Sequence, residues 1–357
     1  MKQIVSRRIL FGLALLTILA LLSGCVTPPR PGTIARRTGD EIVVAGQFVH
    51  TGTRVVLWMD PGGYDAYRVE RRFAPFDQSS WETSQVAVAA LKMPNRYGLR
   101  RDASLTPEHI EQVRGGGWDL PLLQQVVDQF VIHFDASGTS RQCFKTLHDA
   151  RCLSVHFMLD LDGTIYQTLD VKERAWHATT SNTRSVGIEV ASPGAFPVGE
   201  SKPLDSWYAP DTHGGVHVKL PQSIGDGGIR TPNFVARPAR AELVTGDIQG
   251  RPTVQYDFTP EQYRALSHLT ATLCRTLPKI RCEYPRDSKG QLVRAKLPDD
   301  ELNQYQGVLG HYHVQSNKVD PGPAFQWDRV IDGAQALLAE PTGTSAKGGA
   351  QLLRPMR

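Results

Sequence analysis

Residues 310–323, GHYHVQSNKVDPGP, place an imidazole, an ammonium group and a carboxylate within ten positions, at His311, Lys318 and Asp320. Asp320 precedes a proline, which disfavours helical geometry for the residue before it and so holds that residue in an extended conformation. A second imidazole, His133, ends a strongly apolar stretch. A catalytic zinc ion requires three protein ligands and an open fourth position. We therefore predict that His133, His311 and Asp320 bind zinc, which lowers the pKa of water to about 7 and polarises a carbonyl.

The other histidines are weaker candidates for chemistry. His213 and His217, in HGGVH, have a four-residue spacing that suits a metal ion only when both residues lie on one helix. The glycines between them oppose a helix, so we do not expect this pair to bind metal. No polar cluster surrounds the remaining ones in the sequence, and structural roles are expected for His50, His109, His148 and His268.

The elements that must position these residues alternate between strands and helices. Phe130–Phe134 is predicted to be a buried strand that delivers His133 at its end. Residues 140–151, SRQCFKTLHDAR, follow as a helix. Two strands joined at Asp162-Gly163 form a hairpin, since Asp-Gly is a strong turn pair, and residues 184–192, RSVGIEVAS, are another short strand. A mature chain of roughly 330 residues with this alternation holds one sizeable core plus appendages.

Two helices are predicted in the last third of the chain, after a long irregular segment. Thr259-Pro260-Glu261 starts the first helix, which has apolar residues on one face, and the second runs from about residue 324 to 338. Residues 193–258 are far longer than a usual connection. They are rich in glycine yet contain many apolar residues, so an ordered β-rich insertion near a substrate groove is favoured over a disordered loop.

The region before the first candidate ligand has no recognisable chemistry. Residues 41–69 alternate apolar and polar side chains around a Pro-Gly-Gly turn, which predicts a small β element. Residues 70–118 are polar and irregular, with one helix start at Thr106. We treat residues 41–118 as an N-terminal accessory region.

The first 24 residues have the composition of an export signal peptide. Three basic residues precede an apolar run of about fourteen, which is shorter than the roughly 20 that a membrane-spanning helix needs. The sequence LSGC at residues 22–25 resembles the lipobox of bacterial lipoproteins, and Val26 resembles the pattern sent to the outer membrane. We expect Cys25 to be lipidated, residues 25–40 to form a linker, and the protein to be periplasmic and tethered to the outer membrane through its acyl chains. A simple cleaved signal and an uncleaved anchor are the alternatives.

The charge of the mature chain gives little information about partners. Removal of residues 1–24 takes away three basic residues and no acidic ones, so the net charge falls from +4 to about +1. Lysines and arginines are not clustered as they are in nucleic-acid-binding proteins. We therefore predict no nucleic-acid partner.

Four cysteines remain after the signal peptide. Export to an oxidising compartment favours disulfides, and four cysteines allow three pairings. The pairs Cys143–Cys152 and Cys274–Cys282 are preferred because each closes a short loop. A zinc site built from these cysteines is the competing hypothesis, but neither pair has CxxC spacing.

Four segments together resemble the zinc N-acetylmuramoyl-L-alanine amidases of the type-2 amidase and peptidoglycan-recognition-protein family. They are FVIHFDAS, SVHFMLDLDGTIYQ with RAWHA, RSVGIEVAS and GHYHVQSNKVDPGP, and they cover about residues 120–335. The resemblance implies an α/β fold with a central mixed β-sheet flanked by helices and one zinc ion per chain in a surface groove. The small N-terminal β element and the β-rich insertion at residues 193–258 are expected to lie outside the match.

Carried over by position, the resemblance makes His133, His311 and Asp320 the zinc ligands. Glu189, in GIEV, aligns with the family's catalytic glutamate, which is a base for the attacking water and then an acid for the leaving amine. Lys318 aligns with a lysine two residues before the third ligand, and its ammonium group would stabilise the oxyanion.

Further positions concern the substrate groove and departures from the family pattern. Trp176 and His177, in RAWHA, resemble residues that contact the muramyl-peptide, with core packing as the alternative. Some relatives use a tyrosine where this chain has Val155, which leaves the glutamate as the only candidate base. His156 is expected to be structural, and the two residues after the ligand histidine depart from the family pattern.

The implied activity is hydrolysis of the amide bond between N-acetylmuramic acid and L-alanine in peptidoglycan or muropeptides, by a monomer. The predicted amidase domain covers residues 119–340, followed by a flexible tail at residues 341–357. Two alternatives remain open. One is a peptidoglycan-binding lipoprotein without catalysis, and the other is a structural lipoprotein that links membrane to wall.

Overall fold

The described part of the chain from Gly39 onward belongs to one compact unit, and residues 32–38 belong to another. The predicted signal peptide, Cys25 and the predicted C-terminal tail lie outside the described residues. Among the residues described, no helix combines the length and the apolar character needed to cross a membrane. The computed structural model describes residues 32–67, 97–100, 104–114, 117–212 and 214–340.

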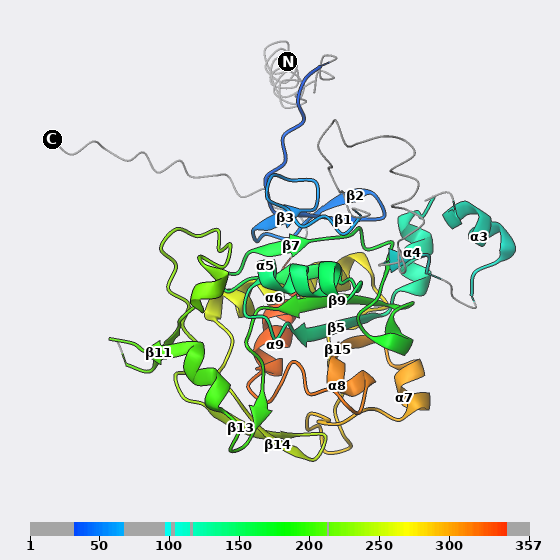
Figure 1. Cartoon of the computed structure of the whole chain (residues 1–357). Coiled ribbons are helices and arrows are strands. Elements are labelled where there is room, and N and C mark those ends of the chain that lie inside the picture. Colours follow the sequence, from blue (N-terminus) through cyan, green and yellow to red (C-terminus); the bar gives the residue numbers. More distant parts are fainter. Residues whose placement is uncertain (1–31, 68–96, 101–103, 115–116, 213, 341–357) are drawn as a thin grey trace, which may run out of the picture. The chain divides into compact units, whose positions relative to one another are not determined.

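A mixed sheet of six strands organises the described residues (Figure 1). Its strands are β3 (Val55–Leu57), β5 (Gln129–Phe134), β6 (Phe157–Leu159), β7 (Ile165–Gln167), β9 (Ser185–Val190) and β15 (Gly307–Gly310). In the order β15-β5-β9-β6-β7-β3, the first four run parallel, β7 is antiparallel to β6, and β3 is parallel to β7. The predicted α/β fold with a mixed sheet is confirmed. The N-terminal β element contributes to it directly, because β3 is an edge strand of this sheet.

Helices cover both faces of the sheet (Figure 1). Phe157 and Leu159 of β6 share a core cluster with the long helix α6, whereas Met158 between them packs with Cys143 and neighbours from α5. This alternation follows from the two-residue period of a strand. The helical elements are α3 (Pro107–Arg114), α4 (Leu120–Val126), α5 (Ser140–Phe144), the π-helical turn η2 (Lys145–Ala150), η3 (Thr179–Ser181), α6 (Pro260–Thr276), α7 (Asp299–Gln304), α8 (His311–Val314) and α9 (Trp327–Ala339).

The start of α6 is fixed by a capping box, as its sequence predicts. Thr259 Oγ1 accepts the N–H of Gln262 at 3.0 Å, and the Gln262 side chain accepts the N–H of Thr259 at 2.9 Å. Pro260 occupies the first helical position, where a missing N–H costs nothing. The helix then presents an apolar face to the sheet. Leu269 lies in the middle of this face with no exposed surface, so its replacement by alanine would cost about 2–5 kcal/mol of stability.

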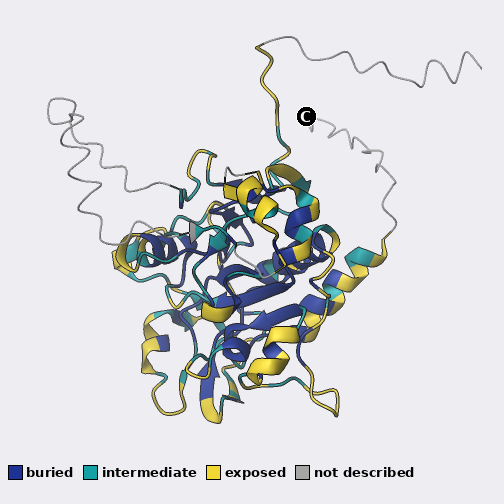
Figure 2. Cartoon of the chain, turned by 90° about the vertical axis from the view of Figure 1, so that its right-hand side faces the viewer, coloured by how far each residue is buried: buried dark blue, intermediate teal, exposed yellow. Residues whose placement is uncertain are grey.

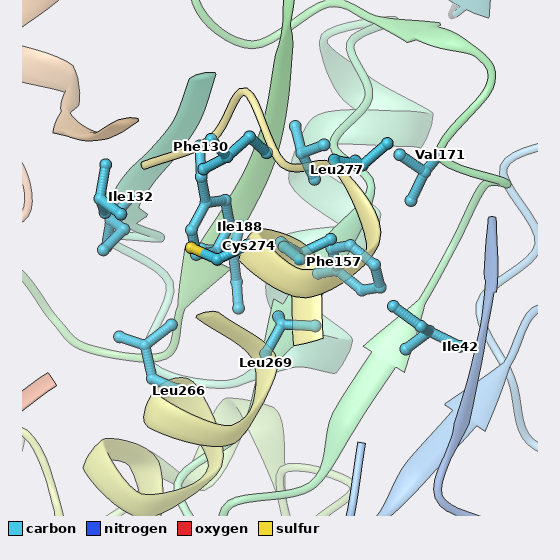
Figure 3. Packing of buried hydrophobic residues seen from close by; sticks show 14 of the residues in the cluster. Ile42, Phe130, Ile132, Phe157, Val171, Ile188, Leu266, Leu269, Cys274 and Leu277 are labelled. Atoms are coloured by element: carbon cyan, nitrogen blue, oxygen red, sulfur yellow. The ribbon is translucent and has the colours of Figure 1, made fainter. Parts of the chain in front are cut away.

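The core between the sheet and α6 is one continuous cluster of buried apolar side chains. Figure 3 shows strand side chains packed against those of the helix, and Figure 2 shows the central strands buried while outward helix faces are exposed. Residues labelled there on the sheet are Phe130, Ile132, Phe157 and Ile188, and those of α6 are Leu266, Leu269 and Cys274.

The segment from residue 193 to 258 is ordered and rich in β structure, as predicted. Its strands are β10 (Phe196–Pro197), β11 (Tyr208–Pro210), β12 (Val216–Val218), β13 (Val244–Ile248) and β14 (Arg251–Gln255), with the 3₁₀ turns η4 (Lys202–Ser206) and η5 (Gln222–Ile224). Strands β10, β14 and β13 form a three-stranded sheet, and β11 pairs with β12. Two further pairs join β1 (Glu41–Val44) to β2 (Gln47–His50) and β4 (Tyr97–Gly98) to β8 (Arg174–Ala175).

The four cysteines of the described residues are free thiols in this structure. Cys143 is buried in the apolar cluster under α5 and η2, where burial raises the pKa of its thiol. Cys274 and Cys282 are neighbours whose thiols share a hydrogen bond, which raises the pKa of Cys274. Both pairings therefore remain predictions, and the structure brings the two thiols of the second pair together.

Candidate active site

The parallel strands β15, β5 and β9 end at one edge of the sheet, and the predicted site residues lie there. His133, near the end of β5, is the register partner of Glu189 in β9. Gly310, the last residue of β15, pairs with Ile132, so His311 begins α8 directly beside the end of β5. The carboxyl ends of parallel strands are where open α/β sheets bind ligands. The sheet topology therefore brings together residues that are far apart in the sequence.

The three predicted metal ligands converge on one point. The Nδ1 atoms of His133 and His311 lie 2.9 Å apart, and Oδ2 of Asp320 lies 3.0 Å from the first and 2.9 Å from the second. All three side chains are buried, and their ligand atoms are close enough to share one metal ion.

The Nε2 atoms of His133 and His311, which point away from the cluster, each have a hydrogen-bond partner. His133 Nε2 lies 3.0 Å from Nδ1 of His177, whose own Nε2 lies 3.3 Å from Oγ of Ser185. His311 Nε2 lies 2.6 Å from the amide oxygen of Gln315. A neutral imidazole has one N–H; when a metal ion takes both Nδ1 atoms, that N–H lies on Nε2, where His177 and Gln315 can accept it. Both Nδ1 lone pairs then face the carboxylate with no proton between them. This donor set fits a cation, and its ligand types are those of zinc.

The protonation states at neutral pH also suit metal binding. Burial lowers the pKa of His133 to about 4, and the neighbouring charge of His311 contributes. Burial alone would raise the pKa of Asp320, but a positive charge on His311, and the hydrogen bonds that His133 and His311 donate when their Nδ1 atoms carry protons, hold it below its ordinary value in the metal-free protein. A neutral imidazole and an ionised carboxylate are the forms that bind metal ions.

Glu189 lies beside this cluster with one free carboxylate oxygen. Its Oε2 is buried, and within the described part of the chain it has no hydrogen-bond partner. Burial raises the pKa of Glu189 well above its ordinary value, the charges of Asp320 and Asp135 raise it further, and Lys318 lowers it. A carboxyl group with a raised pKa can take up and release a proton near neutral pH, as a general base and acid must.

A pocket of about 510 Å³ opens onto these groups. His133, Glu189 and Lys318 line it, so the predicted ligand, base and oxyanion-stabilising group all face one space. Trp176 lines the same pocket. The volume lies within the usual range for small-molecule sites, which is about 300–1,000 Å³.

A family model described as N-acetylmuramoyl-L-alanine amidase matches residues 123–323, more than half of the chain. The chain belongs to this amidase family. The matched range extends across the insertion at residues 193–258.

Three of the solved structures that are similar to this chain are an AmpD derivative and two proteins described as amidases. An AmpD selenomethionine derivative is 16% identical over 67% of this chain and 90% of that chain, with a TM-score of 0.30. The E. coli amidase AmiD, in complex with anhydro-N-acetylmuramic acid-L-Ala-D-gamma-Glu-L-Lys, is 18% identical over 66% and 61%, with a TM-score of 0.31. The endolysin amidase LysCS from Clostridium intestinale URNW is 15% identical over 60% and 86%, with a TM-score of 0.30. No curated protein matches the chain.

His177 makes a contact with His133 that the sequence did not indicate. It lines the pocket, where contact with substrate is predicted, but its ring also accepts the hydrogen bond from the His133 imidazole. A Cβ atom added to Gly187 would lie 2.5 Å from the His177 ring. The glycine in GIEV therefore leaves the space in which His177 supports the metal ligand.

A buried arginine stabilises the segments around the amidase site. The guanidinium group of Arg100 has no exposed surface and donates to the carbonyls of Val171, Thr183 and Ser185 at 2.9, 2.8 and 3.0 Å. Desolvation lowers its pKa to about 9. His156 is buried beside it and accepts an N–H from β9, which confirms its structural role. No feature of the sequence around Arg100 indicated this position.

The residues after His311 support the ligand rather than bind metal. His313 Nδ1 accepts the N–H of Gly310 at 2.9 Å, and its Nε2 donates to the carbonyl of Val293 at 2.7 Å. Tyr312 is fully buried and packs edge-on against Trp327. These two departures from the family pattern therefore fix the backbone around His311.

The HGGVH motif does not join the site. His217 lies in β12 of the insertion, where its Nδ1 is 3.6 Å from the Asp211 carboxylate. No further potential ligand joins it to form a metal-binding group among the described residues, and His213 lies outside them.

Proposed function

We propose that this chain is a zinc-dependent amidase that hydrolyses the bond between N-acetylmuramic acid and the L-alanine of the peptidoglycan stem peptide. The observation that supports it best is the convergence of two Nδ1 atoms and one carboxylate oxygen within 3.0 Å, beside a buried glutamate. A zinc ion held by His133, His311 and Asp320 would supply a Lewis acid that polarises the scissile carbonyl and lowers the pKa of water to about 7.

The chain's own residues would move the protons and stabilise the charge. Glu189 accepts a proton from the attacking water on its carboxylate and returns it to the amide nitrogen, so that the C–N bond breaks and a neutral amine leaves. Lys318 faces the same pocket and offers an ammonium group to the oxygen on which negative charge develops. With the N–H of each imidazole on Nε2, the Nδ1 lone pairs of His133 and His311 would remain available to the zinc ion.

Peptidoglycan fragments are the proposed ligands. The pocket has room for a small ligand, and Trp176 provides an aromatic wall next to the reacting groups. The AmiD structure contains an anhydro-muramyl tripeptide, which is the class of molecule we propose for this pocket.

The test uses a soluble form of the chain that begins after Cys25, loaded with zinc. It is incubated with muropeptides and separately with intact sacculi, and the products are identified by mass spectrometry. Release of the stem peptide with a free L-alanine amino group supports the proposal. Tight binding of peptidoglycan by a protein that holds zinc and releases no peptide would instead favour the non-catalytic wall-binding alternative.

We also propose that the protein is a monomer attached through a lipidated Cys25 to the periplasmic face of the outer membrane. The support for this is the LSGC sequence after a short apolar run. Metabolic labelling with radioactive palmitate should mark the protein, and Cys25→Ser should abolish both the label and its recovery in outer-membrane fractions. Light scattering of the soluble form should give the mass of one chain.

A further inference from the structure

The hairpin formed by β13 and β14 reaches from the insertion to the segment that holds two of the three proposed ligands. We call residues 311–324 the ligand loop. At the tip of the hairpin, the Gln249 side-chain nitrogen donates to the carbonyls of Tyr312 at 2.8 Å and Gln315 at 2.9 Å. Its side-chain oxygen accepts the N–H of Lys296 at 3.0 Å. Both N–H donors and the oxygen of this amide are therefore engaged.

The other end of the hairpin holds the ligand loop after Asp320. Gln255, which is buried, donates to the carbonyl of Pro321 at 3.1 Å and accepts the N–H of Ala324 at 3.1 Å. A Cβ atom on Gly322 would lie 2.1 Å from the Gln255 side-chain oxygen. The two glutamines thus hold the loop on both sides of the carboxylate ligand.

The ligand loop has little regular structure with which to hold its own shape. Helix α8 contains four residues, and a single helical turn is unstable without tertiary support. Within the loop, the N–H of Tyr312 donates to the carbonyl of Asp320 at 3.1 Å. The geometry of His311 and Asp320 therefore depends on contacts from outside the loop.

The turn at the hairpin tip is not one that favours glutamine. Gln249 has a φ of 60° and Gly250 a φ of 70°, and a two-residue hairpin turn with both angles positive prefers asparagine or aspartate before the glycine. A residue with a Cβ atom is strained in this region, and asparagine tolerates it better than glutamine does. Asparagine is one methylene shorter, so it would suit the turn and fail to reach the ligand loop.

We propose that hairpin β13–β14 is a brace for the ligand loop, and that Gln249 and Gln255 are positioning residues that keep His311 and Asp320 in metal-binding geometry. This inference rests on the zinc ligand set proposed above. It gives the insertion a role at the metal site, through the backbone of the loop and without contact to the metal ion.

The variant Gln249→Asn removes the contact with the ligand loop and keeps a residue that suits the turn. If the hairpin has no role at the metal site, this change should leave the stability of the protein unchanged or increase it. A brace predicts that the zinc affinity, measured by chelator competition, falls by about 10-fold or more, which is the size of effect seen when supports of metal ligands are lost. The absorption spectrum of the Co²⁺-loaded protein should change as well, while the melting temperature of the metal-free protein stays at the wild-type value. The matched control is Gln304→Asn at the exposed end of α7.

Zinc affinity and a Co²⁺ spectrum equal to wild type in Gln249→Asn would overturn the brace. Loss of the wild-type near-ultraviolet circular dichroism in the metal-free variant would also overturn it, because Gln249 would then serve folding of the hairpin. If the wild-type protein binds no zinc, the proposed function fails instead, and this outcome is distinguishable because the wild type is measured first.

Discussion

Glu189 and His133 are direct register partners on the neighbouring parallel strands β9 and β5. Their side chains leave the sheet on the face opposite Ile132 and Ile188, which pack into the core with α6. One proposed zinc ligand and the proposed base are therefore held by two adjacent buried strands inside the sheet. Sites built on strands are positioned more accurately than sites built on loops, and only the ligand loop needs a separate support.

Replacement of Glu189 by glutamine should remove catalysis and leave the metal site intact. An amide of the same shape cannot accept the proton, so kcat should fall by about 100-fold to 10,000-fold. Zinc content, measured by atomic absorption, should remain one per chain. The exposed Glu242 provides the control, since Glu242→Gln makes the same chemical change away from the pocket. A Glu189→Gln protein with wild-type kcat would eliminate this residue as the base.

Replacement of Lys318 by methionine should affect the transition state more than substrate binding. The ammonium group lines the pocket beside Glu189, and loss of such a donor costs about 3 kcal/mol, or roughly 100-fold in kcat. KM should change little in steady-state assays on a muropeptide. Lys289→Met, at an exposed turn, is the control. A rise in KM with unchanged kcat would instead make Lys318 a substrate-binding residue.

Replacement of His177 by alanine should weaken zinc binding, although His177 is not a proposed ligand. The change removes the acceptor that keeps the proton of His133 on Nε2, and loss of such partners typically lowers metal affinity by about 10-fold to 100-fold. Chelator competition measures this effect, with His217→Ala in the insertion as the control. An unchanged zinc affinity would show that the orientation of His133 is set by the strand alone.

The contribution of Asp160 to the stability of the protein should fall as the pH rises from about 4 to 7. Burial raises the pKa of this carboxyl group to about 7, and the charges of Asp162 and Asp135 add to the shift. The folded state therefore keeps a proton that the unfolded state has released across this range. Its contribution to the slope is at most about 1.4 kcal/mol per pH unit.

Asp160→Asn, which resembles the protonated acid, should reduce this slope. Denaturant unfolding at pH 5 and pH 8 should show the variant close to wild type at the lower pH and more stable than wild type at the higher one. The Asp160 Oδ1 atom accepts the N–H of Leu161, and asparagine can retain that bond. Parallel stability curves for the two proteins would show that Asp160 is ionised in the folded state.

The parts of the site that could be predicted from the sequence are those marked by residue types and spacings within a short segment. The spacing of His311 and Asp320, the apolar stretch before His133 and the Asp-Gly turn between β6 and β7 each report on their immediate neighbours. Strand alternation then predicts which face a residue occupies. These features were sufficient for the interspersed strands and helices and for the three candidate ligands, whereas the mixed α/β fold was implied by the family resemblance.

Contacts between distant segments could not be predicted in this way. Arg100 and Gln249 act through backbone carbonyls, which every residue has, so no partner residue type marks them. The edge strand β3 joins the sheet through β7, more than a hundred residues later, and nothing in its own pattern names that partner. Sequence separation also does not indicate the direction in which a side chain packs, so the burial of Cys143 in the apolar cluster of α5 could not be predicted.

The decisive experiment is mass spectrometry of a muropeptide after incubation with the protein stripped of metal and then supplied with one equivalent of zinc. The proposed chemistry predicts no reaction without metal, and with zinc it predicts two products: the muramyl sugar and an intact stem peptide with a free L-alanine amino group. The proposal would be contradicted by a protein that holds one zinc ion and leaves the muropeptide uncut, or by cleavage at the same rate in the presence of excess chelator.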